Sequence, residues 1–168
     1  MKSFFSSVKA LRSYGFRGFV TVRDLAQGKL ADVPKVPGVY VVLRPAKAPA
    51  GIRRTNPAYR FKGRDPTLPV AALRSKWPKR ALVLYIGKAG KRDGKATLVK
   101  RLRSYLRSGQ GLPSAHWGGR AIWQVVNADD LLVAWLQTTA SGARVIEQKL
   151  ISEFEREHGS LPFANRAR

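Results

Sequence analysis

A short apolar run, a basic loop and an amphipathic segment follow one another in the middle of the chain. Residues 81–86 have the length and composition of a buried strand, which Gly87 interrupts. Thr97 is a plausible N-cap for a helix that follows the loop. The apolar residues of that helix recur at helical spacing, at Leu98, Leu102, Tyr105 and Leu106. A strand that leads through a loop into an amphipathic helix predicts a fold that mixes both kinds of element.

The loop between this strand and this helix is basic and contains glycines. It contains Lys88, Gly90, Lys91, Arg92 and Gly94. Backbone N–H groups and the helix dipole both favour anions at a helix N-terminus, so we expect Lys91 and Arg92 to contact nucleic acid. The glycine and lysine spacing of a P-loop is absent, which argues against a nucleotide triphosphatase.

The charge of the chain points to a polyanionic partner. There are 32 Lys and Arg residues against 10 Asp and Glu residues, a net charge of +22. A folded domain with this excess repels itself unless a polyanion neutralises it, so nucleic acid is the first expectation. An anionic membrane surface is second, but no long basic amphipathic segment supports it.

Other function classes are excluded by what the sequence lacks. There are no cysteines, and therefore no disulfide framework, thiolate metal site or thiol nucleophile. No apolar run reaches membrane-spanning length, and the first residues lack the apolar core of a signal peptide. We expect a cytoplasmic protein without a membrane partner, and the sequence sets no oligomeric state.

The sequence predicts a chain of two parts. Residues 1–33 are predicted to be a basic, mainly helical appendage, and residues 34–168 the main domain. Helices are expected at 4–14, 22–27, from Thr97 onwards and at 141–158, where Gly159 is a C-cap. Strands are expected at 39–43, 81–86, 121–126 and 131–136, and the turn residues 127–130 predict that the last two pair as a hairpin.

Residues 45–80 form a long connection of unusual composition. They contain ten Lys or Arg residues and six prolines. Aromatic residues among basic ones suit a nucleic-acid backbone and its bases. The alternative is a surface insertion that packs its own aromatic residues. The candidate nucleic-acid contacts are Arg53, Arg54, Tyr59, Arg60, Lys62 and Arg64.

Glu147 lies inside the apolar face of the last predicted helix. Ile146, Leu150 and Phe154 share that face. A carboxylate there is costly unless it is paired or binds a metal ion. Two interpretations stay open, an ion pair with one of the many arginines and a metal site.

These pieces, in this order, resemble the GIY-YIG nuclease family. The two tyrosine motifs stand here as Gly38-Val39-Tyr40 and Tyr85-Ile86-Gly87. The helix with the essential arginine matches residues 98–105, with Arg101 as that arginine. Glu147 matches the metal-binding glutamate, and Asn165 matches the late asparagine. The resemblance covers residues 34–168.

The resemblance implies an α+β fold, with a small antiparallel sheet flanked by helices, and a metal-dependent endonuclease. Glu147 would hold one Mg²⁺ or Mn²⁺ ion, and Arg101 would contact the scissile phosphate. Asn165 would orient the site. Tyr40 and Tyr85 would orient or deprotonate water, tuned by Lys88, Arg101 or the metal ion. Tyr105 stands where members carry Tyr or His. The implied substrate is DNA, with RNA left open.

Two departures from the family pattern concern the connections. Tyr40 and Tyr85 are 45 positions apart, because residues 45–80 form a basic insertion between the motif strands. The loop from 89 to 98 is also longer than usual. The competing interpretation is a non-catalytic nucleic-acid-binding module with the nuclease fold. Residues 147–149 also match a Glu-x-Lys nuclease signature, but that signature needs a strand, and this stretch has helical periodicity.

Overall fold

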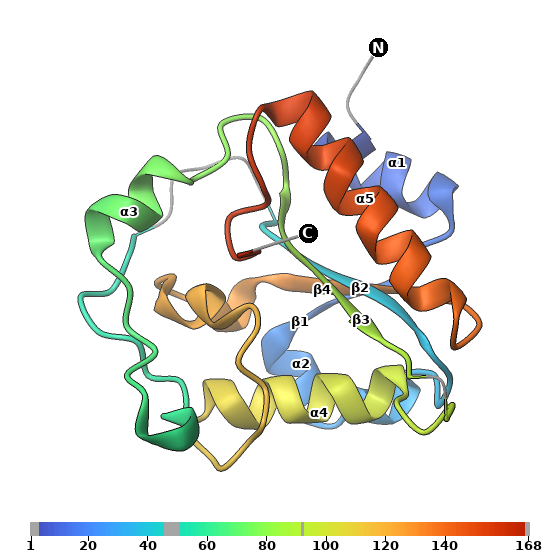
Figure 1. Cartoon of the computed structure of the whole chain (residues 1–168), viewed down its shortest axis with the longest axis horizontal. Coiled ribbons are helices and arrows are strands. Elements are labelled where there is room, and N and C mark those ends of the chain that lie inside the picture. The colour runs from blue at the N-terminus through green and yellow to red at the C-terminus, as the bar shows by residue number, and fades with distance from the viewer. Residues whose placement is uncertain (1–3, 46–50, 92, 167–168) are drawn as a thin grey trace.

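The computed structural model describes residues 4–45, 51–91 and 93–166. Its described residues form an α+β fold around a four-stranded antiparallel sheet with the order β1-β4-β2-β3 (Figure 1). The expected fold class and antiparallel sheet are confirmed. No helix in the described ranges is both long and apolar enough to cross a membrane.

The central strand of the sheet is buried along its whole length. Strand β2 (Gly38–Leu43) pairs with β3 (Val83–Ala89) on one side and β4 (Leu132–Gln137) on the other. Strand β1 (Arg17–Thr21) pairs with β4 at the far edge. The helices are α1 (Val8–Tyr14), α2 (Val22–Ala26), α3 (Val70–Ser75), α4 (Leu98–Gly109) and α5 (Gly142–His158).

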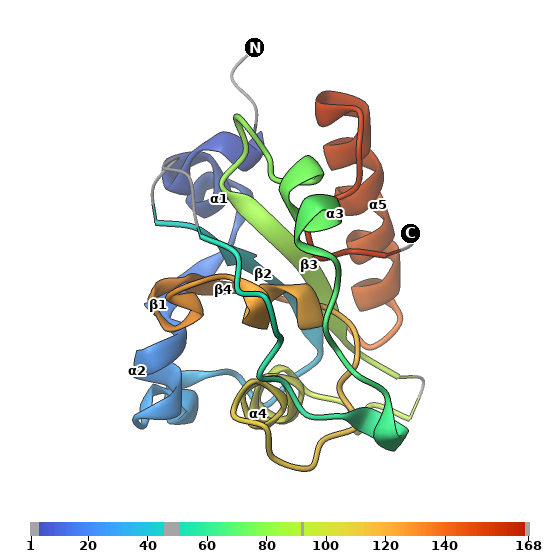
Figure 2. The ribbon, with the colours of Figure 1, turned by 90° about the vertical axis from the view of Figure 1, so that its left-hand side faces the viewer.

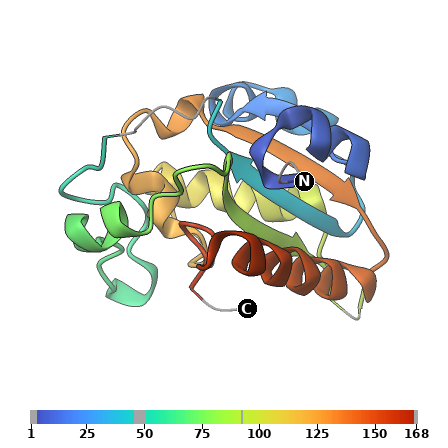
Figure 3. The ribbon, with the colours of Figure 1, turned by 90° about the horizontal axis from the view of Figure 1, so that it is seen from above.

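Helices cover both faces of the sheet. Tyr40 and Val42 of β2 pack in the same core cluster as the apolar side of α4. Val39 and Val41 point to the opposite face and pack with α1 and α5. Figure 3 shows α1 and α5 on one side of the sheet and α4 on the other. Burial on both faces explains why β2 and β3 read as continuous apolar runs.

Local signals set the ends of two helices. The Thr97 hydroxyl accepts a hydrogen bond from the Lys100 backbone N–H and caps the N-terminus of α4. Gly159, with a φ of 72°, ends α5 in the left-handed conformation that glycine adopts without strain. Both predicted caps are confirmed.

The N-terminal segment is built into the fold rather than attached to it. The helices predicted there correspond to α1 and α2, but the same segment also supplies β1, which the sequence did not predict. Phe5, Leu11 and Phe16 are fully buried in the cluster beneath α5. Gly18 and a register shift after it interrupt the apolar alternation, which hides β1 in the sequence.

The predicted strand at 121–126 is wrong. Residues Arg120–Gln124 form a 3₁₀ helix, and all five are buried. The Gln124 side chain accepts a hydrogen bond from the Leu68 N–H and donates to the carbonyls of Leu68 and Arg53. The long connection therefore covers this apolar run in place of a neighbouring strand, and the predicted hairpin does not form.

The connection between β2 and β3 passes the C-terminal end of α4 (Figures 1 and 2). The Tyr59 N–H donates to the Ser108 carbonyl at that end. The buried Asn56 amide donates to the carbonyls of Arg120 and Pro66. Side-chain amides therefore hold the connection against the 3₁₀ helix.

Candidate active site

Three tyrosine rings from three elements meet beneath the sheet. Tyr40 comes from β2, Tyr85 from β3 and Tyr105 from α4. The ring centroids of Tyr40 lie 5.9 Å from Tyr85 and 6.2 Å from Tyr105, and Tyr85 stacks on Tyr105 at 6.3 Å. The two motif tyrosines, separated by a long connection in the sequence, are therefore neighbours in space.

Gly87 makes room for the Tyr40 ring. The two residues are register partners on β2 and β3. A Cβ atom on Gly87 would lie 2.6 Å from Cζ of Tyr40 and 2.7 Å from its hydroxyl oxygen. A side chain at position 87 is therefore incompatible with the observed ring position, which gives the glycine of the second motif a packing reason.

Burial keeps all three phenols protonated. It raises the pKa of Tyr40, and it raises the pKa values of Tyr85 and Tyr105 well above the usual range. The nearby Arg101 cation opposes the increase at Tyr40 and Tyr85. Near neutral pH the tyrosines of the free protein therefore act as hydroxyl groups rather than as phenolate bases.

Tyr85 and Tyr40 differ in their access to solvent. Tyr85 lines two cavities. We call one the Asn165 cavity, because Asn165 lines it, and the other the Arg101 cavity, because Arg101 lines it. The Asn165 cavity has a volume of about 260 Å³ and the Arg101 cavity about 220 Å³. Tyr40 is completely buried and lines neither. Of the two motif tyrosines, Tyr85 is the one that can touch a bound molecule.

Lys88 and Glu147 line both cavities together with Tyr85. Lys88 Nζ donates to Glu147 Oε2 at 2.6 Å, and the Glu147 side chain is 15% exposed. The ion pair that the sequence left open is present, but its partner is a lysine rather than an arginine. This pair places a cation and a carboxylate side by side at the junction of the two cavities.

The carboxylate is the donor that a metal ion would use here. Glu147 offers oxygen ligands, which Mg²⁺ and Mn²⁺ prefer. Within the described ranges no three or more His, Cys, Asp or Glu residues gather as a metal site. A Mg²⁺ ion bound through one carboxylate, waters and a substrate phosphate fits this donor set.

Arg101 lies near the start of α4, and its side chain lines the cavity that is named after it. Its Nε is buried, and no described residue accepts a hydrogen bond from it. Arg103 and Arg107, on the same helix, are exposed on the outer side. The helix register predicted from the apolar spacing is thus correct, and the inner arginine is left without a carboxylate among the described residues.

Asn165 holds the free edge of β3. Its Oδ1 accepts from the Ile86 N–H at 3.0 Å, and its Nδ2 donates to the Ile86 carbonyl at 2.9 Å. The Ala164 N–H donates to the Leu84 carbonyl in the same way. The C-terminal segment therefore acts as a partial strand beside β3, and Asn165 positions the strand that carries Tyr85 and Lys88.

The predicted nucleic-acid contacts fall into two groups. Lys91 lines the Arg101 cavity, whereas Arg92 lies outside the described residues. Tyr59 is half-buried against the end of α4. Five cations of the connection are exposed and line neither cavity, and one of them, Arg60, pairs with Asp65 at 2.8 Å. These five are Arg53, Arg54, Arg60, Lys62 and Arg64.

Several residues at the site were not predicted from the sequence. Trp117, Gly118, Gly119 and Arg166 line the Asn165 cavity. A Cβ atom on Gly119, whose φ is 73°, would lie 2.8 Å from the Tyr85 ring. The sequence signal for them was two adjacent glycines after a tryptophan. Such a pair predicts a turn, but it does not predict that the turn packs against Tyr85.

No protein-family model, no curated protein and no solved structure matches the chain significantly.

Proposed function

We propose that the protein is a metal-dependent endonuclease that hydrolyses DNA phosphodiester bonds. One observation carries the proposal: Arg101, whose buried Nε has no hydrogen-bond partner among the described residues, lines the same cavity as Tyr85 and the Lys88–Glu147 pair. Phosphodiester hydrolysis needs positive charge at phosphorus, an oriented water and a site for a metal ion. These side chains can supply all three functions.

The proposal is supported by the resemblance to the GIY-YIG nucleases. Tyr40 and Tyr85, the tyrosines of the two motifs, stand on adjacent antiparallel strands. Arg101, Glu147 and Asn165 surround the second of them. On this proposal residues 45–80 are a basic insertion between the motif strands. The resemblance covers residues 34–168, and the N-terminal segment completes the same sheet with β1.

Arg101 would bind the scissile phosphate. Its planar guanidinium can donate two hydrogen bonds to phosphate oxygens, and no described carboxylate competes for it. Tyr85 would orient the attacking water through its neutral hydroxyl, since burial and its neighbours keep it protonated. Tyr40 would support Tyr85 by packing against its ring, and Asn165 would hold the strand that carries Tyr85.

Glu147 would hold a Mg²⁺ or Mn²⁺ ion, and Lys88 would hold the carboxylate in place. When bound, the ion would add positive charge beside the scissile phosphate. Lys88 faces the same space, so the substrate phosphate would meet two cationic side chains, Lys88 and Arg101. DNA is the proposed partner, and the cytoplasm is the proposed location.

A non-catalytic nucleic-acid-binding module is the second candidate. The net charge of +22 serves binding and cleavage equally. The Lys88–Glu147 ion pair favours this alternative, because it satisfies the carboxylate without a metal ion.

Cleavage assays separate the two candidates. Linear, branched, single-stranded and modified DNAs are incubated with the protein in Mg²⁺, Mn²⁺ or EDTA. We expect cleavage that needs the ion and is abolished by Glu147→Gln, while binding is kept because a negative charge leaves a basic surface. Glu153→Gln, further along α5, is the matched control and should cleave normally. Binding without cleavage of any substrate would favour the module.

A further inference from the structure

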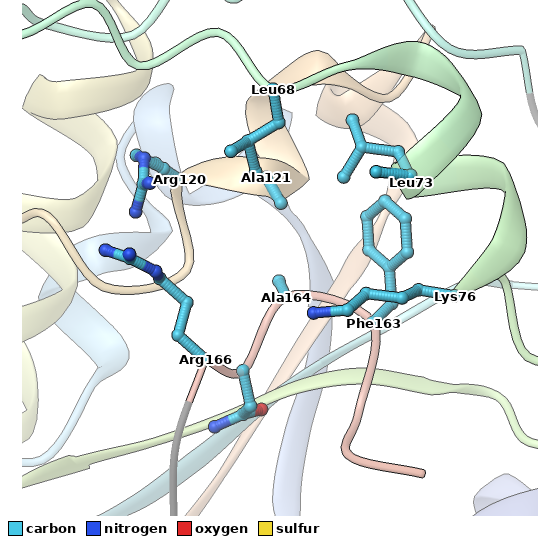
Figure 4. Close-up of a pocket in the computed structure, with 10 residues that line it drawn as sticks. Leu68, Leu73, Lys76, Arg120, Ala121, Phe163, Ala164 and Arg166 are labelled. Atoms are coloured by element: carbon cyan, nitrogen blue, oxygen red, sulfur yellow. The ribbon is translucent and has the colours of Figure 1, made fainter.

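A third cavity lies beside the Asn165 cavity and collects three cations (Figure 4). Its volume is about 100 Å³, and its floor is apolar. Lys76 comes from the end of α3, Arg120 from the 3₁₀ helix and Arg166 from the C-terminal segment. Leu73, Ala121 and Phe163 contribute to the floor. We call this space the Arg120 pocket.

Arg120 is a buried cation that no described carboxylate pairs with. It is 7% exposed, and its Nε and Nη1 have no hydrogen-bond partner among the described residues. Its guanidinium lies over the Trp117 ring, 4.3 Å from the centroid. Burial lowers its pKa, and so does the neighbouring charge of Arg166. Figure 4 shows the two guanidinium groups facing one another.

Such an arrangement is unfavourable on its own. A buried charge is costly unless it is paired and hydrogen-bonded, and two like charges at one site add to the cost. No ion pair found among the described residues includes Arg120 or Arg166. An anion placed between the two guanidinium groups would remove both penalties, and a phosphate has the oxygens to accept from both.

The Arg120 pocket adjoins the proposed active site. Ala164, Asn165 and Arg166 line both the pocket and the Asn165 cavity. Trp117, on which Arg120 lies, also lines the Asn165 cavity. A nucleic-acid strand that passes from Arg101 along the edge of β3 would therefore reach the pocket next.

We propose that the Arg120 pocket binds a second phosphate group of the nucleic acid, on the strand that is cut, with Arg120 and Arg166 as its ligands. The site extends the proposed nuclease function, because it sets which phosphate neighbours the scissile one. The apolar floor would face the attached sugar. An internal phosphodiester and a terminal phosphate share this chemistry, and the test distinguishes them.

The binding test uses the full chain without metal ions and follows the Nε–H signal of Arg120 by NMR. Arg120→Lys removes that signal and so assigns it. The ligands are thymidine, thymidine 5′-monophosphate and the dinucleotide dTpdT. We expect saturable shifts with a phosphate-bearing ligand and none with thymidine. A stronger response to dTpdT identifies an internal phosphodiester, and a stronger response to the monophosphate a terminal phosphate.

Variants make the result specific. Arg166→Gln should weaken the phosphate-dependent binding about tenfold, because it removes a charge-assisted contact made by an exposed side chain. Arg74→Gln, on α3 but outside the pocket, removes the same charge and should change the binding less than about twofold. Equal behaviour of these two variants, or an unmoved Arg120 signal, would overturn the proposal.

The cleavage assay keeps the two proposals distinct. If the protein cuts DNA, Arg166→Gln should raise KM with little effect on kcat, because the second phosphate contributes to binding throughout the reaction. If no DNA is cut but Arg120 responds to phosphate, the nuclease proposal fails and the anion site stands. If cleavage is normal in Arg166→Gln and Arg120 does not respond, the pocket proposal alone fails.

Discussion

Lys88 on β3 donates to Glu147 on α5 across 2.6 Å, at the point where two cavities meet. The pair links the edge strand of the sheet to the helix that covers it. It also explains how a carboxylate on an apolar helix face is tolerated, since its charge is compensated and part of it reaches solvent. The same position makes the carboxylate available to a ligand that enters either cavity.

Arg101→Ala should reduce the single-turnover cleavage rate by about 10²-fold or more, because only a positioned cation neutralises charge that develops at phosphorus. DNA affinity should change much less, since many other cations hold the backbone. Arg103→Ala, which removes an exposed cation from the outer side of α4, is the matched control. Equal rate losses in quench-flow measurements of the two variants would contradict the proposed role.

Tyr85→Phe should slow cleavage by about 10²-fold while the protein stays folded, because the lost hydroxyl belongs to a residue that lines both cavities. Tyr40→Phe should affect the rate less, since Tyr40 is fully buried and lines neither cavity. Single-turnover rates on the same substrate compare the two variants. A larger loss in Tyr40→Phe would reverse the assignment.

Asn165→Ala should lower the free energy of unfolding by about 2 kcal/mol, because it leaves the buried N–H and carbonyl of Ile86 without partners. Urea denaturation at neutral pH measures the change. Gln148→Ala, at an exposed position of α5, should stay within about 0.5 kcal/mol of wild type. A stability of Asn165→Ala equal to that control would mean that the edge of β3 does not depend on this amide.

His116 should make stability depend on pH. It is 1% exposed, and burial and the charge of Arg101 lower its pKa from 6.5 to about 3. Below pH 6.5 the unfolded chain takes up a proton that the folded protein excludes, so stability falls as the pH drops towards 3, by about 1.4 kcal/mol per pH unit.

The variant His116→Phe isolates this effect. The difference in unfolding free energy between wild type and variant should shift by about 1.6 kcal/mol from pH 6.5 to pH 5, because the carboxylates titrate alike in both proteins. Urea denaturation at the two pH values gives the four free energies required. Parallel pH dependence in the two proteins would show that His116 is not buried as a neutral group.

The exposed cations of the β2–β3 connection should contribute to DNA binding beside the site. Replacing Arg54, Lys62 and Arg64 together by Gln should flatten the slope of log affinity against log salt by up to about 2.7 on duplex DNA, at about 0.9 per phosphate contact. The control replaces three exposed cations on α1 and α5, namely Lys9, Lys149 and Arg156. Fluorescence anisotropy across a salt series measures the slope of each triple variant. Equal slopes for the connection variant and the control variant would mean that the connection does not contact the DNA.

Contacts near in the chain were predictable from the sequence. The apolar spacing of α4 and its Thr97 cap, and the Gly159 end of α5, are local signals, and local hydrogen bonds and side-chain periodicity act through neighbouring residues. The continuous apolar runs of β2 and β3 similarly predicted buried strands. Three of the motif residues, Tyr85, Arg101 and Glu147, line one cavity.

Contacts between distant residues decided the rest. The Gln124 side chain bonds to Leu68, 56 positions away, at the end of an apolar run that resembles a strand but forms a buried 3₁₀ helix. Likewise, Lys88 became the partner of Glu147, and Arg120 came to lie beside Arg166, through packing between elements far apart in the chain. An apolar residue in the sequence indicates burial, but it does not indicate which surface covers the residue, because the hydrophobic effect has no direction. The sequence by itself determined the elements with local caps and periodicity. Only the tertiary structure decided which motif tyrosine lines a cavity and which arginines have no carboxylate partner within the described part of the chain.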